Sequence, residues 1–318
     1  MPATPPAALP RLGWSLVLRI AAGLLVPILL TLTFTPEASL AAVGGALLGA
    51  VGSLVGSSRR SLLGAAVLLG LLGLDHWLPG SFGLLPIALI LALAAGVESA
   101  TTGGRSLTMA LFGAVMLAGA VFRDGAAPST AAMVFAASLV YGALLAVTLN
   151  LHGRAALPAN SARGGIEQAV FLCAGLLLTQ ALMAGFDTTQ ALWTAQMFVM
   201  RAMASPDLSP RRSLQYVAGA AIGAGLAAAW QELGLTAEIP WLRLLLAAVF
   251  LLLGLRYAIA ARVFSAAALT LAVLLSSAAT PGQALIRFEA AGLSALLALL
   301  LLLALQVLGA WLWRPRDP

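Results

Sequence analysis

Residues 287–313 read RFEAAGLSALLALLLLLALQVLGAWLW, and no charged residue follows Glu289 in this stretch. A helix needs about 20 apolar residues to cross the hydrocarbon core of a bilayer. The whole chain has the same character: it has 318 residues, 61% hydrophobic and 9% charged, with a mean hydropathy of +1.02. Soluble domains carry about 25% charged residues. The composition therefore excludes a soluble enzyme, a nucleic-acid binder and a disordered protein, and it predicts an integral membrane protein.

Apolar windows recur along the chain and predict about twelve transmembrane helices. They cover 15–34, 38–56, 61–78, 82–99, 105–122, 129–150, 166–185, 189–204, 212–230, 240–257, 260–276 and 287–313. The polar stretch LHGRAALPANSARGG at 151–165 separates six windows from six. We therefore expect an all-α protein with a first six-helix membrane repeat at 1–150, a cytoplasmic linker at 151–165 and a second six-helix membrane repeat at 166–318.

The arginines predict the topology of these spans. All 17 basic residues are Arg, and they stand singly or in pairs between apolar runs, as in the loops of a multi-pass membrane protein. With twelve spans, fourteen of them lie on the side of the two termini, and only Arg123, Arg243 and Arg287 lie on the other. Arginine gathers in cytoplasmic loops. Both termini are therefore expected in the cytoplasm, with the chain crossing the cell membrane many times.

An internal repeat appears when the chain is shifted by 152 residues. The sequence AGLL at 22–25 then falls on AGLL at 174–177, and RRSL at 59–62 falls on RRSL at 211–214. Because each half holds an even number of predicted spans, the two halves should enter the membrane in the same orientation. Transporters built from two such halves place the substrate path between them, near the middle of the bilayer.

The second half carries a recognisable motif. Trp193 opens the eighth window, the run WTAQMFVM follows, then the polar turn SPDLSP at 205–210, Arg211-Arg212, and finally Gly219 and Gly223. Over residues 166–225 this pattern resembles the repeat of the fusaric acid resistance (FUSC-like) and aromatic acid exporter proteins.

The chain also departs from that family pattern. Met203-Ala204 stand where the family has Gln-Pro, and in the first half Ala41, Val67 and Leu71 stand at the Trp and Gly positions. The resemblance implies the export of aromatic or other organic acids, often together with a periplasmic adaptor protein.

The eighth window supplies the candidate substrate-binding residues Gln190, Trp193, Thr194, Gln196 and Arg201. At 100° per residue, Trp193, Gln196 and the 200/201 position share roughly one helix face. A charge at membrane depth usually faces a cavity or a partner, which makes Arg201 a candidate ligand for an anion, with Trp193 stacking an aromatic ring. The alternative is an arginine that extends to the inner lipid head groups.

Two arginine pairs, Arg59-Arg60 and Arg211-Arg212, occupy the same place in each half. They are candidates for a cytoplasmic anion vestibule, because clustered positive charge concentrates anions and arginine binds carboxylates bidentately. The alternative is that they anchor the topology and bind lipid head groups.

Glu98 and Glu289 are the candidates for proton coupling, although each lies near the end of a window and suits a paired or solvated residue as well. We expect no metal and no cofactor, since His76 and His152 fall in loops on opposite sides and Cys173 is the only cysteine.

The sequence favours a transporter that exports small aromatic or other organic anions by alternating access between its halves. The alternative is a membrane scaffold or regulatory subunit without transport activity. An enzyme is not expected, because acid–base or metal chemistry needs clustered His, Asp or Glu. The expected partners are the anion, the lipid bilayer, and a periplasmic adaptor or a second copy of the chain, with no nucleic acid.

Overall fold

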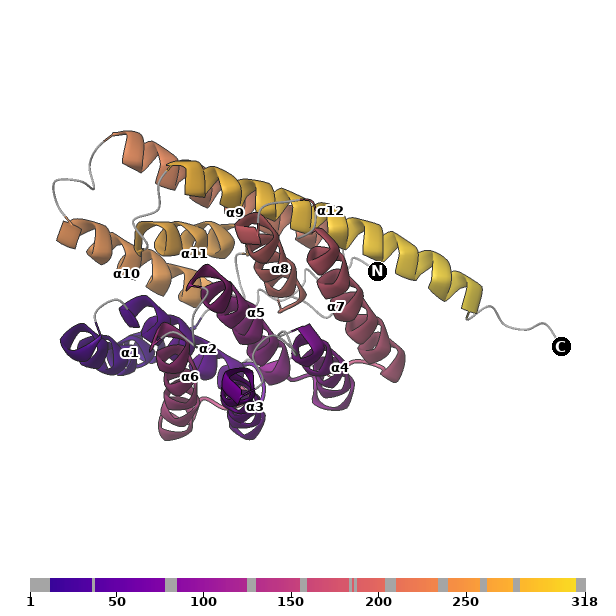
Figure 1. The fold of residues 1–318 in the computed structure, drawn as a ribbon, viewed down its shortest axis with the longest axis horizontal. Coiled ribbons are helices and arrows are strands. Elements are labelled where there is room, and N and C mark those ends of the chain that lie inside the picture. Colours follow the sequence, from indigo (N-terminus) through magenta and orange to yellow (C-terminus); the bar gives the residue numbers. More distant parts are fainter. Residues whose placement is uncertain are drawn as a thin grey trace, which may run out of the picture. The chain divides into compact units, whose positions relative to one another are not determined.

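The computed structural model describes residues 12–35, 38–77, 85–124, 130–154, 159–182, 185, 188–203, 210–233, 240–257, 262–276 and 281–312. These residues form twelve helices and no strand (Figure 1). The prediction of an all-α protein is confirmed, and each apolar window of the sequence contains one helix.

The helices begin and end close to the predicted limits. They are α1 (Trp14–Phe34), α2 (Ser39–Leu54), α3 (Ser58–Trp77), α4 (Leu85–Thr102), α5 (Ser106–Asp124), α6 (Thr130–Thr148), α7 (Ala162–Leu182), α8 (Thr188–Met203), α9 (Pro210–Glu232), α10 (Pro240–Tyr257), α11 (Arg262–Ser276) and α12 (Pro281–Leu312). Proline is the first residue of α9, α10 and α12, where its missing N–H has no helical partner to lose.

The largest differences are at the starts of α7 and α12, which begin at Ala162 and Pro281 instead of 166 and 287. Helix α7 starts at Ala162 because Ser161 caps it, its Oγ accepting from the N–H of Gly164 at 3.0 Å. An ion pair one turn apart, Arg163 to Glu167 at 2.7 Å, extends the helix into the predicted linker. Helix α12 starts at Pro281, so Arg287, expected at the edge of a loop, lies within the helix and is buried.

Four helices are long and apolar enough to cross a membrane, judged by length and composition over the described residues. They are α1, α4, α7 and the Ala284–Leu308 part of α12. Large apolar side chains on these helices, such as Leu29, Val97 and Val307, are more than half exposed. Helices with this length, composition and outward apolar surface are typical of membrane-spanning proteins.

The chain divides into two compact units, which are described separately. One unit contains residues 1–21 with 214–288, and the other contains 22–213 with 289–318. The predicted halves 1–150 and 166–318 were defined by a repeat in the sequence and not by compactness. The division into compact units does not test them, and they stay a prediction.

Small residues let the helices of the larger unit approach closely. A Cβ at Gly45 or Gly49 of α2 would collide with the carbonyl oxygens of Phe135 or Leu139 in α6. Helices α4 and α7 meet in the same way, since a Cβ at Gly96 would lie 2.6 Å from the Gly165 oxygen and one at Gly165 would lie 2.7 Å from the Gly96 oxygen. This is the packing of small residues expected between membrane helices.

The α4–α7 contact continues beyond the helix ends. The N–H of Asn160, just before α7, donates to the Ser99 carbonyl oxygen at 2.9 Å, and its Nδ2 lies 3.2 Å from the Ser99 Oγ. Helix α4 therefore meets the start of α7 along a continuous seam.

In the smaller unit, helices α9, α10 and α11 enclose an apolar core of Ala and Leu residues. Gly219 and Gly223 of α9 lie against the backbone of α11 at Val263 and Ala267. The start of α1 belongs to this unit. The N–H of Leu12 donates to the Arg256 carbonyl oxygen at 3.4 Å, and the Arg256 guanidinium lies 4.1 Å from the centre of the Trp14 ring. Helix α1 therefore meets the end of α10.

Candidate functional site

Arg201, in the last turn of α8, lies inside the larger unit with only 7% of its surface exposed. Its guanidinium carbon is 5.1 Å from the centre of the Phe171 ring in α7. Phe171 in turn stacks on Phe198, with the ring centres 4.7 Å apart. The Phe198 ring occupies the space beside Gly175, part of the repeated AGLL, where a Cβ would collide with it. Arg201 thus packs against protein rather than extending outward.

The other predicted ligands on α8 are spread along the helix. Gln190 lies eleven residues before Arg201, about 16 Å away at 1.5 Å per residue. Its Nε2 donates to Glu289 Oε2 of α12 at 2.9 Å. The Thr194 hydroxyl is buried and donates to the Gln190 carbonyl oxygen at 2.8 Å, while Trp193 and Gln196 are half-buried. The structure therefore joins Gln190 to Glu289 and keeps both apart from Arg201.

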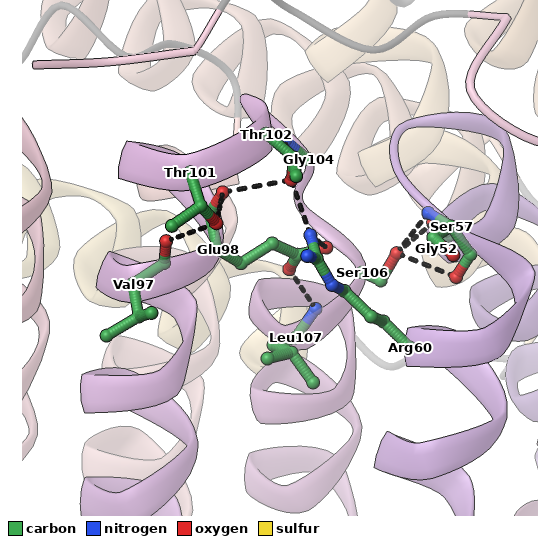
Figure 2. Close-up of polar contacts among 10 residues, drawn as sticks. All are labelled: Gly52, Ser57, Arg60, Val97, Glu98, Thr101, Thr102, Gly104, Ser106 and Leu107. Atoms are coloured by element: carbon green, nitrogen blue, oxygen red, sulfur yellow. Dashed lines mark hydrogen bonds and ion pairs between the residues drawn. The ribbon is translucent and has the colours of Figure 1, made fainter.

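Glu98 of α4 is the most deeply buried carboxylate that the structure describes, with 2% of its surface exposed. Its Oε1 lies 3.5 Å from Nη1 of Arg60 in α3. Figure 2 shows Arg60 reaching across to this carboxylate, and the same Nη1 donates to the Thr102 hydroxyl. The sequence made Arg60 a candidate for the vestibule and Glu98 a candidate either for proton coupling or for a paired or solvated residue, and the structure pairs the two.

Glu98 also caps the start of α5. Its Oε2 accepts from the N–H of Leu107, in the first turn of α5, at 2.7 Å (Figure 2). A carboxylate there satisfies a backbone donor without a helical partner and favours the positive end of the helix dipole. Gly104 leaves room for this contact, since a Cβ there would lie 2.7 Å from Glu98 Oε1. The chain reaches the cap through Gly103, whose φ of 66° is readily adopted by glycine.

Ser106 connects the start of α5 to the turn between α2 and α3. Its hydroxyl oxygen accepts from the N–H of Ser57 at 2.8 Å and lies 2.9 Å from the Gly52 carbonyl oxygen, to which it can donate (Figure 2). Together with the Glu98 cap, this fixes the ends of α2, α3, α4 and α5 at one end of the larger unit.

The remaining vestibule residues have different surroundings from Arg60. Arg59 of α3 and Arg211 of α9 are exposed. The side chain of Arg212 lies outside the part of the chain that the structure describes, and so do the polar-turn residues 205–209. Exposed arginines at helix starts suit both the vestibule and the anchoring interpretation.

Three buried polar residues of the larger unit were missed in the sequence. Arg105 was counted in the sequence only among the arginines on the side of the termini, yet it is 2% exposed and its Nη1 donates to the Ala202 carbonyl oxygen, at the end of α8, at 2.6 Å. Thr108 of α5 and Gln168 of α7 are also buried. A polar residue inside an apolar window was the only indication available for the last two.

Over the described ranges, no group of three His, Cys, Asp or Glu side chains lies close enough to hold a metal ion. Comparison with known proteins adds no assignment: no protein-family model, no curated protein and no solved structure matches the chain.

Proposed function

We propose that the chain is a transporter that exports small aromatic or other organic anions across the inner membrane of a bacterium, with both termini in the cytoplasm. In this proposal all twelve helices cross the bilayer, as two parallel six-helix halves that alternate access to the anion. The observation that carries the proposal is the burial of Arg201 among apolar helices.

Arg201 supports an anion site because placing a charged side chain among apolar helices costs free energy. An arginine in the membrane interior costs about 3 kcal/mol on insertion scales, and such residues usually mark substrate paths. The Arg201 guanidinium lies 5.1 Å from the centre of the Phe171 ring, so an aromatic surface borders the buried charge. A carboxylate matches the planar guanidinium with two parallel hydrogen bonds, and a neighbouring aromatic ring suits an aromatic acid.

Two helix junctions support the parallel halves. A twofold axis between two such halves requires that a contact from the fourth helix of one half to the first helix of the other recur in the reverse sense. Helix α4 meets the start of α7 through Ser99 and Asn160. Helix α10 meets the start of α1 through Arg256 and Trp14. These are the fourth and first helices of the predicted halves, and they meet reciprocally.

The motif from Trp193 to Gly223 supports the same class of function, since it resembles the repeat of FUSC-like and aromatic acid exporter proteins. On this view a periplasmic adaptor or a second copy of the chain completes the export path. The glycines of the motif pack α9 onto α11, so their role in this chain is close helix packing.

Uptake of radiolabelled benzoate into everted membrane vesicles tests the proposal. We expect accumulation above vesicles that lack the protein, and a loss of about tenfold or more in the rate for Arg201→Gln, which corresponds to ~1.4 kcal/mol of lost interaction. Arg163→Gln is the matched control, because Arg163 is exposed and forms an ion pair with Glu167 one turn away on the same helix. It should transport like the wild type.

Absence of uptake for the wild-type protein over a panel of aromatic and aliphatic acids would favour the scaffold instead. The predicted topology has its own test. Single cysteines at Arg59 and Arg211, in a Cys173→Ser background, should both react with an impermeant maleimide in everted vesicles. Labelling from opposite faces would contradict parallel halves.

A further inference from the structure

Gln168, the seventh residue of α7, is a buried amide whose hydrogen bonds are not made within the described part of the chain. It is 3% exposed, and neither its Oε1 nor its Nε2 has a hydrogen-bond partner among the described residues. Buried amides in proteins are almost always paired with protein, ordered water or a ligand. An amide with both atoms unpaired therefore indicates that something else occupies its neighbourhood.

Thr108, the third residue of α5, has the same property. It is fully buried, and its Oγ1 has no partner among the residues that the structure describes. The buried threonines of α7 and α8 differ, because Thr179 and Thr194 donate to carbonyl oxygens of their own helices at 2.9 and 2.8 Å. The Thr108 hydroxyl is thus available to a group outside its helix.

The register of α7 directs Gln168 toward α5. Phe171 and Gly175 of α7 contact Phe198 of α8, whereas Gly165 lies against Gly96 of α4. At 100° per residue, position 168 falls between these two directions. Helix α5 contacts both α4 and α8, so the side of α7 that lies between them faces α5.

The register of α5 directs Thr108 back toward the same place. Ser106 contacts Gly52 of α2, and Arg105 contacts Ala202 of α8. Position 108 lies about 200° around the helix from Ser106 and about 60° from Arg105, on the side away from α2. Thr108 therefore faces α8 and α7 rather than the α2–α3 turn.

The two arginines lie at the same end of the unit. Arg201 is in the last turn of α8 and Arg105 immediately precedes α5, and both are buried. Gln168 is within two turns of the start of α7. The contacts from Arg105 to Ala202, from Glu98 to Leu107 and from Asn160 to Ser99 tie these four helix ends together.

We propose that Thr108 and Gln168 bind the carboxylate of a small organic anion together with Arg201, and that Arg105 contributes positive charge to the same site. The four residues are called the buried anion cluster. An amide NH₂, a hydroxyl and a guanidinium are all donors, which is the complement of a carboxylate. The inference rests on the proposed function, since it names the ligands of the anion that Arg201 is proposed to bind.

Binding of benzoate to the purified full-length protein in detergent tests the cluster, with neutral benzamide as the uncharged analogue. Titration calorimetry should show binding of benzoate and none of benzamide. Gln168→Met and Thr108→Val should each weaken benzoate binding about tenfold, the loss of one to two hydrogen-bonding contacts. Thr108→Ser, which keeps the hydroxyl, should bind like the wild type.

Two variants serve as matched controls. Thr179→Val removes a buried hydroxyl that donates within its own helix, and Gln306→Met removes an exposed amide of α12. Neither should change benzoate binding. Thermal unfolding without ligand shows whether each variant is folded, and a folded Gln168→Met or Thr108→Val that binds benzoate normally overturns the cluster. A wild-type protein that binds no benzoate overturns it too.

The transport assay separates this inference from the proposed function. Benzoate binding that depends on Gln168 and Thr108, without uptake into vesicles, would support the cluster and contradict the transporter. Uptake that Arg201→Gln abolishes, but that Gln168→Met and Thr108→Val leave unchanged, would support the transporter and contradict the cluster. If Gln168→Met and Thr108→Val both raise the unfolding temperature and leave benzoate binding unchanged, the cluster is contradicted. The unpaired polar groups would then only destabilise the folded protein.

Discussion

The fourth and fifth helices of the six before the linker are joined differently from those of the six after it. Between α4 and α5, the buried Glu98 accepts from Leu107 N–H at 2.7 Å and pairs with Arg60. Between α10 and α11, the Ser265 hydroxyl donates to the Gly254 carbonyl oxygen at 2.8 Å, and α10 contains no acidic residue. The first junction depends on a buried carboxylate, whereas the contact at the second joins a neutral hydroxyl to a carbonyl oxygen. The two predicted halves therefore differ in the contacts between their fourth and fifth helices, although parts of their sequences match.

Replacing Glu98 should have the largest effect on this contrast. Glu98→Ala leaves the Leu107 N–H without its acceptor and Arg60 without its counter-ion, which should lower the free energy of unfolding by about 3 kcal/mol. Unfolding by sodium dodecyl sulfate in mixed micelles measures the loss. Amide hydrogen exchange at Leu107 should accelerate as well, and unchanged exchange there would contradict the cap.

Replacing Arg60 should have a smaller effect than replacing Glu98. The Arg60 side chain is 33% exposed, so solvent screens its charge. We expect Arg60→Gln to cost about 1–2 kcal/mol. A double-mutant cycle with Glu98→Gln measures the coupling between the two residues. A coupling energy of zero would show that the carboxylate is held by the helix start alone.

Removing the neutral contact should have a smaller effect still. Ser265→Ala deletes one hydroxyl-to-carbonyl hydrogen bond, for which about 1 kcal/mol is typical. The thermal unfolding of the purified protein measures the change. A loss as large as that for Glu98→Ala would mean that the two junctions are equally strong and that charge does not distinguish them.

The exposed arginines should matter least to stability. Arg59→Gln and Arg211→Gln should each change the free energy of unfolding by less than about 0.5 kcal/mol, because both side chains lie on the surface. If they form a vestibule, the same variants should slow benzoate uptake at low salt, with the difference disappearing at high salt. Uptake that is insensitive to both substitutions would leave anchoring as their role.

The helices could be predicted from the sequence because each depends on an apolar run and on the residues that directly flank it. Apolar runs bounded by Arg, Gly and Pro gave twelve windows, and one helix lies in each. The starts of α7 and α12 were placed too late, since the polar residues Ser161, Arg163 and Arg287 suggested loops. In the structure the first two stabilise a helix start through a cap and an ion pair, which depend on geometry rather than polarity.

The site was less predictable because its contacts join distant parts of the chain. Arg60 and Glu98 are separated by 38 residues, and Arg105 and Ala202 by 97. No spacing rule within one helix connects them. For Arg201 the sequence left a protein-facing and a lipid-facing orientation open. The Phe171 contact from α7 is what distinguishes them, and it depends on how the two helices pack.

The glycine pair Gly96 and Gly165 has a consequence for movement. At their crossing α4 and α7 approach backbone to backbone, and the nearest side chains, those of Ala100 and Ala169, have no rotamers to change. Separating α4 from α7 would leave a gap between the two helices that only lipid tails could fill. If the protein alternates access as proposed, this line of contact should stay closed throughout the cycle, and the movement should take place elsewhere in the bundle.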